Sequence, residues 1–91
     1  MGLAMHEAGL MRDLMRKITN LATAENANRV TGVTVWLGAL SHMSPAHFQE
    51  HFDQAAHGTL AEGAQIRCET SDDIQNPNAD GILLRSIETE G

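Results

Sequence analysis

The segment Met5-His6-Glu7 places an imidazole beside a carboxylate, directly ahead of an amphipathic run of residues. Two interpretations fit this arrangement. The first is an ordinary helix start, in which Glu7 lies in the first turn and its negative charge suits the helix dipole. The second is a metal site built on a chain terminus. This second interpretation requires a free amine at Met5, whereas residues 1–4 precede Met5 in the sequence.

Two further histidines, His47 and His51, stand four residues apart in a segment with helical periodicity. At this spacing two imidazoles on one helix face can bind the same metal ion. No glutamate directly follows His47, so the pair does not match the zinc-protease motif. A zinc hydrolase would also need a third ligand, which the sequence does not nominate. The pair is therefore interpreted either as a solvated helix flank or as an auxiliary metal site.

Two single residues carry distinctive side chains. Cys68 is the only cysteine, which excludes an internal disulfide and a four-cysteine zinc ribbon within one chain. It alternates with Ile66, so we expect a small core residue rather than a reactive thiol. Trp36 lies between the apolar residues Val35 and Leu37 and should point to the opposite sheet face. There it is either covered by another element or exposed as a partner contact.

Charge and length exclude several classes of protein. The 91 residues carry a net charge of −6 and contain no basic cluster, which argues against nucleic acid and against an anionic membrane surface as partners. No apolar run is long enough for a signal peptide or a membrane span. We expect a single cytoplasmic domain, residues 1–91, whose modest core leaves pairing into a homodimer open.

Hydrophobic periodicity predicts two helices. The first spans residues 7–24, and the second spans residues 41–58, with Ser44 as N-cap and Gly58 at its C-terminal end. The residues expected to face the core are Leu10, Met11, Leu14, Ile18, Leu21 and Ala22 in the first helix and Phe48, Phe52, Ala55 and Ala56 in the second.

Three other segments predict strands. Residues 29–40 alternate in polarity, and Gly32 shifts this alternation as a β-bulge does. Residues 64–70 and 82–90 form the other two strands, and the polar loop 71–81 between them allows an antiparallel pairing of the two. The expected fold is α+β with two layers, in the order α-β-α-β-β, with two helices packed on one face of a three-stranded mixed sheet.

Three stretches in this order resemble the hydrogenase nickel-insertion accessory family, HypA/HybF. They are MHEAGLM (5–11), RVTGVTVWLGALS (29–41) and GTLAEGA (58–64), with weaker support from the terminal SIETE. Members of that family begin with Met-His-Glu and a helix, then carry a strand that ends in a Gly-Ala-Leu-Ser-like turn. A second helix leads to Gly-Thr-Leu-Ala-Glu-Gly-Ala. The likeness covers nearly the whole chain from Met5.

One part of the family pattern is missing. Family members insert a zinc ribbon with two paired-cysteine motifs between their last two strands, where this chain has only residues 71–81, without a cysteine. Structural zinc takes four sulfur or imidazole ligands. The resemblance therefore implies the nickel-binding part of the family without its zinc ribbon, and we expect no structural zinc.

The resemblance also implies a function. Members of this family are nickel metallochaperones for the maturation of NiFe-hydrogenase and sometimes urease. It implies a non-enzymatic protein that binds Ni(II) transiently, with Met5, His6 and Glu7 as the site. Its implied partners are an accessory GTPase and a hydrogenase or urease precursor. A terminal amine, the next backbone nitrogen and its imidazole can form fused chelate rings, an arrangement that suits the preference of Ni(II) for nitrogen ligands.

Residues 1–4 leave two alternatives open. If Met5 is the native start, its amine is free and the chelate can form. If Met1 is the start, the Met5 nitrogen is a peptide amide, a poor ligand, and the family's site is changed or lost. A metal-free paralogue would instead act as a binding or regulatory module, with Trp36 and the open sheet face as its contact surface.

Overall fold

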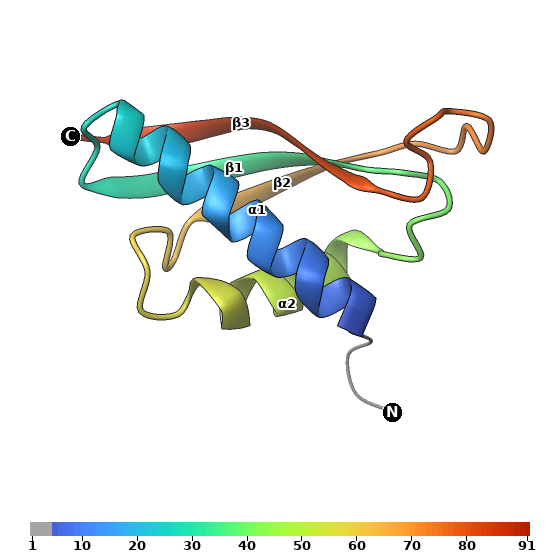
Figure 1. Cartoon of the computed structure of the whole chain (residues 1–91), viewed down its shortest axis with the longest axis horizontal. Helices are drawn as coiled ribbons and strands as arrows, with labels where there is room; N and C mark the ends of the chain where they lie inside the picture. Colours follow the sequence, from blue (N-terminus) through green and yellow to red (C-terminus); the bar gives the residue numbers. More distant parts are fainter. Residues whose placement is uncertain (1–4) are drawn as a thin grey trace.

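The computed structural model describes the backbone of residues 5–91 and the side chains of residues 9–91. The elements, in chain order, are α1 (Met5–Ala24), β1 (Arg29–Leu37), α2 (Pro45–Ala56), β2 (Gln65–Thr70) and β3 (Ile82–Glu90). Both helices pack on one face of a three-stranded sheet (Figure 1). The predicted fold class and element order are confirmed. No helix within residues 5–91 combines the length and apolar character needed to cross a bilayer.

Strand β1 lies in the centre of the sheet, and the strand order is β2-β1-β3. It pairs parallel with β2 and antiparallel with β3. The expected antiparallel pairing of the last two strands with each other is therefore wrong. The reason is the connection through α2, which returns the chain to the starting end of β1 and makes β2 parallel, as in a β-α-β unit. The fully buried residues of β1 suit its central position; they are Val30, Val33, Val35 and Leu37.

Two irregularities in the pairing of β1 with β3 explain the imperfect alternation of both strands. The register shifts near Gly32, which confirms the bulge predicted there. It shifts again between Thr34 and Val35. Because a bulge adds one residue to one strand, Leu84 and Ile87 both pack against the core although they are three residues apart in β3.

The core fills the space between the sheet and the two helices. The phenylalanine rings of α2 stack with their centroids 6.0 Å apart. The buried helical side chains are Met11, Leu14, Ile18 and Ala22 from α1 and Phe48, Phe52 and Ala56 from α2. Leu21 departs from the prediction, since 44% of it is exposed. It lies on the flank of α1 rather than over the sheet, in a groove that it shares with Leu83 at the edge strand β3.

Local signals set the two ends of α2. The Ser44 hydroxyl accepts a hydrogen bond from the backbone N–H of His47 at 3.2 Å, which confirms Ser44 as the N-cap. Helix α2 therefore begins at Pro45, directly after the predicted N-cap. Beyond its last residue, Ala56, the chain turns at Gly58, whose φ of 79° is a left-handed conformation that glycine adopts without steric cost.

The segment 71–81 crosses the end of β1 and so connects the two edges of the sheet (Figure 1). Just past β1, Gly38 donates its N–H to the carbonyl of Gly81 at 3.0 Å, and Leu40 donates to the carbonyl of Ala79 at 2.7 Å. Ala79 is only 3% exposed. The loop is therefore packed against the end of β1 and is not a hairpin turn.

Candidate functional site

The three residues of the predicted nickel site lie at the amino end of α1. Met5, His6 and Glu7 belong to the first turn of this helix, but their side chains lie outside the described part of the chain. The backbone alone has a chemical consequence, because the first four N–H groups of an α-helix have no acceptor within that helix. The nitrogens of Met5 and His6 are therefore not used in the helical hydrogen-bond ladder, as a metal site built on them requires.

Core packing holds the amino end of α1 in place beside α2. Met11 is buried, and it follows Glu7 by four residues, a separation of about 6 Å along a helix axis. Figure 1 shows the amino end of α1 beside α2. The predicted site therefore lies on a helix that is anchored in the core one turn further along.

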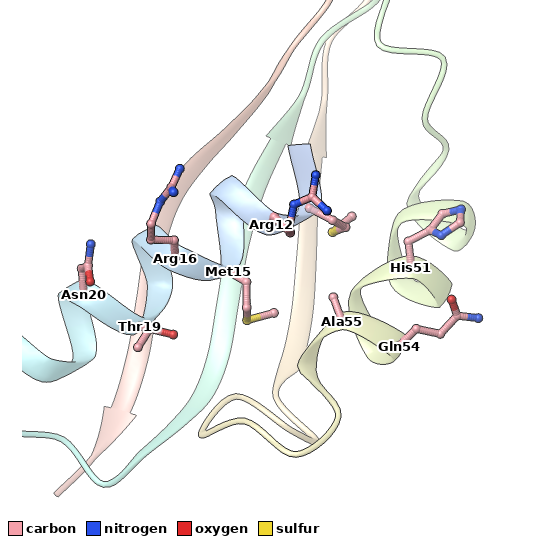
Figure 2. A pocket seen from close by; sticks show the side chains of 9 residues that line it. Arg12, Met15, Arg16, Thr19, Asn20, His51, Gln54 and Ala55 are labelled. Atoms are coloured by element: carbon pink, nitrogen blue, oxygen red, sulfur yellow. The ribbon is translucent and has the colours of Figure 1, made fainter. Parts of the chain in front are cut away.

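A groove of about 630 Å³ runs between α1 and α2. Figure 2 shows Met15 and Ala55 facing one another across it, with Arg12 and Arg16 on the α1 side and His51 on the α2 side. The groove therefore has an apolar floor and basic groups at its rim. The sequence reasoning did not predict it. The available signal was Met15, a large apolar residue one position beyond the buried stripe.

The histidine pair on α2 is brought together as its spacing predicted. The ring centroids of His47 and His51 are 4.5 Å apart, with the ring planes tilted by 35°. His47 is exposed and His51 is half-buried. Among the side chains that the structure describes, no group of three or more His, Cys, Asp or Glu could hold a metal ion. The third ligand needed for a zinc hydrolase is therefore not found among residues 9–91.

Neither of the two helices that the structure describes lies on the outer face of the sheet, since α1 and α2 both pack on the other face. Trp36 is half-buried on this outer face, in register with Glu69 of β2 and Leu83 of β3. The Arg85 Nε lies 3.3 Å from the Glu69 Oε1, so this ion pair joins the two outer strands across β1. Trp36 is thus flanked by side chains of the neighbouring strands, and neither α1 nor α2 covers it.

Three side chains that could act as nucleophiles, those of Cys68, Ser41 and Ser44, are engaged in packing or in local hydrogen bonds. Cys68 packs with Ile66 against the core, as predicted, and burial raises the pKa of its thiol. A thiol that stays protonated at neutral pH is a weak nucleophile and a weak metal ligand. Ser41 donates its hydroxyl to the carbonyl of Gly38 at 2.7 Å, and Ser44 caps α2. These contacts assign the two serines to the loop and helix start rather than to a reaction.

Comparison with known proteins identifies the class to which this fold and amino-terminal segment belong. The family model described as "Hydrogenase/urease nickel incorporation, metallochaperone, hypA" matches residues 5–75. Because this match covers most of the chain, the chain belongs to the HypA family. The resemblance found in the sequence is thereby confirmed.

Individual relatives agree with this assignment. The chain is 36% identical over 66 residues to the hydrogenase maturation factor HypA of Picosynechococcus, covering 72% of this chain and 58% of that one. It is 36% identical over 62 residues to the HypA of Archaeoglobus fulgidus, covering 68% and 56% of the two chains. The match to the Salmonella typhimurium HypA is 35% over 65 residues, covering 71% and 55%. The matched region spans little more than half the length of these relatives.

A solved structure supports the fold. The solution structure of a HypA protein superposes with a TM-score of 0.72, covering 96% of this chain and 98% of that one at 17% sequence identity. At this level of identity the comparison shows the shared fold and not a shared activity.

Proposed function

We propose that the chain is a nickel metallochaperone that binds Ni(II) at the amino end of α1 and delivers it to the precursor of a NiFe-hydrogenase or a related nickel enzyme. The observation that carries this proposal is where the family match begins: it starts at Met5, which is also the first residue of α1. The relatives that the chain matches are named hydrogenase maturation factors, which supports the delivery step.

The proposed ligands are the α-amine of Met5, the backbone nitrogen and imidazole of His6, and the carboxylate of Glu7. Nitrogen ligands in a tetragonal arrangement are a combination that Ni(II) favours, and an adjacent carboxylate adds an oxygen ligand or orients the imidazole. The helix end supports this set because its first N–H groups have no helical acceptors. A site with few ligands at the end of one helix also suits release of the ion to a recipient.

The rest of the proposal concerns the setting of this site. We place the protein in the cytoplasm, with a separate accessory GTPase and a hydrogenase or urease precursor as its partners. We treat residues 1–91 as one domain without structural zinc, because Cys68 is the only cysteine and the crossing 71–81 contains none. Metal analysis of the purified chain should accordingly find no tightly bound zinc.

The decisive experiment is a Ni(II) titration of two forms of the chain, one beginning at Met1 and one at Met5. We expect the form with a free Met5 amine to bind its tightest nickel ion through His6, so that His6→Ala removes this ion. His57→Ala removes one histidine at a distant exposed position and serves as the matched control; it should leave the tightest ion in place. Equal nickel affinity for the His6→Ala chain and the parent would refute the proposed site.

Delivery is tested separately, in cells that depend on this chain for an active nickel enzyme. The parent gene should restore the nickel content of that enzyme, and His6→Ala should not. Restoration by the His6→Ala gene would contradict the delivery role even if nickel binding were confirmed.

A further inference from the structure

The paired imidazoles on α2 have no part in the proposed function, although their arrangement suits metal binding. His47 and His51 are four residues apart on one helix face, and their ring centroids are 4.5 Å apart. We propose that these two side chains form a second metal site, which binds Ni(II) or another borderline divalent ion such as Zn(II). The assignment of nickel as the natural ion rests on the proposed function, whereas the two-imidazole site itself does not.

The helix that carries the pair is firmly placed. Phe48 and Phe52 are each 0% exposed, and they fix the orientation of α2 against the sheet. Ser44 caps the helix just ahead of His47. The two imidazoles therefore project from neighbouring turns of a rigid element, so little order has to be imposed when an ion binds. Imidazole nitrogen is a suitable ligand for nickel, zinc and copper.

The number of ligands determines how strongly such a site binds. Among the described side chains no third His, Cys, Asp or Glu completes a cluster around an ion. Among residues 9–91 the pair therefore supplies two ligands, and other groups fill the remaining positions around the ion. Such an open site is expected to bind more weakly than the amino-terminal chelate and to exchange its ion readily.

Charges around the pair indicate which side the ion occupies. Arg12 lines the same groove as His51, and its positive charge opposes a cation between the two helices (Figure 2). His47, on the outer side of the pair, is more exposed to solvent than His51. The net charge of −6 favours cation binding in general. The ion is therefore assigned to the solvent side of α2.

The position of the pair gives it a connection to the proposed amino-terminal site. His51 lines the groove together with Met11, and Met11 follows Glu7 by four residues in α1, about 6 Å along the helix axis. The second site thus lies on the element next to the first turns of α1.

The test uses the full chain carrying His6→Ala, titrated with nickel chloride alone in a buffer that does not bind metal. Calorimetry measures the stoichiometry and affinity, and NMR of the histidine side chains shows which rings are affected. We expect one ion per chain, with signals of His47 and His51 broadened. Adding His47→Ala should weaken binding about 100-fold, because the remaining imidazole loses the high effective concentration of its partner.

A matched variant keeps the number of histidines constant. Gln49→His combined with His51→Ala retains all the other histidines but places the two imidazoles two residues apart, on different helix faces. This variant should lose the site, whereas His57→Ala should retain it. Far-UV circular dichroism checks that each variant is folded, and His51→Gln provides a second, more conservative removal of the ring.

Two results would overturn the inference. One is equal weakening by His47→Ala and His57→Ala, which would indicate scattered single imidazoles. The other is the complete loss of nickel binding in the His6→Ala chain. The proposed function fails under a different condition, namely when His6→Ala leaves the tightest ion of the parent in place, so the two proposals are tested independently.

Discussion

The glycine that follows β1 should be among the most sensitive positions in the molecule. A Cβ at Gly38 would lie 2.2 Å from the carbonyl oxygen of Ala79 and 2.8 Å from that of Asn78. Both atoms belong to backbone, so no side-chain rotation can relieve the overlap. We expect Gly38→Ala to push the 71–81 crossing away from the end of β1.

The expected loss of stability follows from the contacts that this displacement would break. Two backbone hydrogen bonds join the residues after β1 to the last part of this segment, from the Gly38 N–H to the carbonyl of Gly81 at 3.0 Å and from the Leu40 N–H to the carbonyl of Ala79 at 2.7 Å. At about 0.5–1.5 kcal/mol each they contribute about 1–3 kcal/mol. Exposing the methyl group of Ala79 adds about 0.8 kcal/mol. Gly38→Ala should therefore lower the free energy of unfolding by about 2–4 kcal/mol, out of about 5–14 kcal/mol for a domain of this size.

Two other glycines provide matched controls for this substitution. Nothing lies within 4 Å of a Cβ at Gly9 in α1, so Gly9→Ala should stabilise the fold by about 0.5–1 kcal/mol. At Gly32 the added Cβ would meet the Glu88 Oε1 at 2.2 Å, but this atom ends a flexible side chain that can turn away. Gly32→Ala should therefore change stability by less than about 1 kcal/mol.

Thermal and urea unfolding measure all three variants. The melting temperature of the Gly38→Ala chain should fall by at least about 8 °C, at about 4–8 °C per kcal/mol. Unfolding of Gly38→Ala at the temperature and urea midpoint of the parent would refute the reasoning. Destabilisation of all three variants to the same extent would also refute it, because only the contact at Gly38 is with backbone.

Two further predictions concern single side chains. Ser44→Ala should lower the free energy of unfolding by about 1 kcal/mol, because the N-cap of α2 is lost. The control Ser86→Ala, at an exposed position of β3, should change this free energy by less than about 0.5 kcal/mol. Equal urea midpoints for the two variants would contradict this prediction. Burial raises the pKa of the Cys68 thiol, so the fold favours the protonated form. This stability is fully present below the unfolded pKa of about 8.5 and is lost as the pH rises through the higher folded pKa. The parent should therefore lose stability above about pH 8.5 more steeply than Cys68→Ala; parallel pH profiles would contradict this.

Local sequence signals were sufficient to predict the elements of this fold. A cap at Ser44, a bulge at Gly32 and the periodicity of α1 act over a few residues, so they can be recognised without knowledge of the tertiary structure. The meeting of His47 and His51 also follows from helix geometry alone. The structure adds the separation of the two rings, 4.5 Å between centroids, and the position of His51 at the groove between the helices.

The strand order and the groove depend on contacts between distant segments. The loop 71–81 is compatible with a hairpin, but β1 has the most buried inward face and pairs with both other strands. The connection from β1 to β2 runs through α2, and parallel pairing needs a crossover of this kind. Leu21 is exposed because it lies on the flank of α1, whereas Ala22, the next residue, is fully buried. The groove lined by Met15 exists only because two helices cross, so no single segment encodes it.

The path of segment 71–81 has a consequence for the architecture of the sheet. Neighbouring strands are spaced about 4.8 Å apart, so the ends of β2 and β3 on either side of β1 are about 10 Å from each other. Eleven residues lie between Thr70 and Ile82 (82 − 70 − 1), and an extended chain of that length would reach about 36 Å. The extended length of segment 71–81 is thus more than three times the distance between the two strand ends that it connects. Its length alone would allow a shorter connection, at the cost of the contacts that Ala79 and Gly81 make with the residues after β1, or a longer one that holds an additional module, with the strand order unchanged.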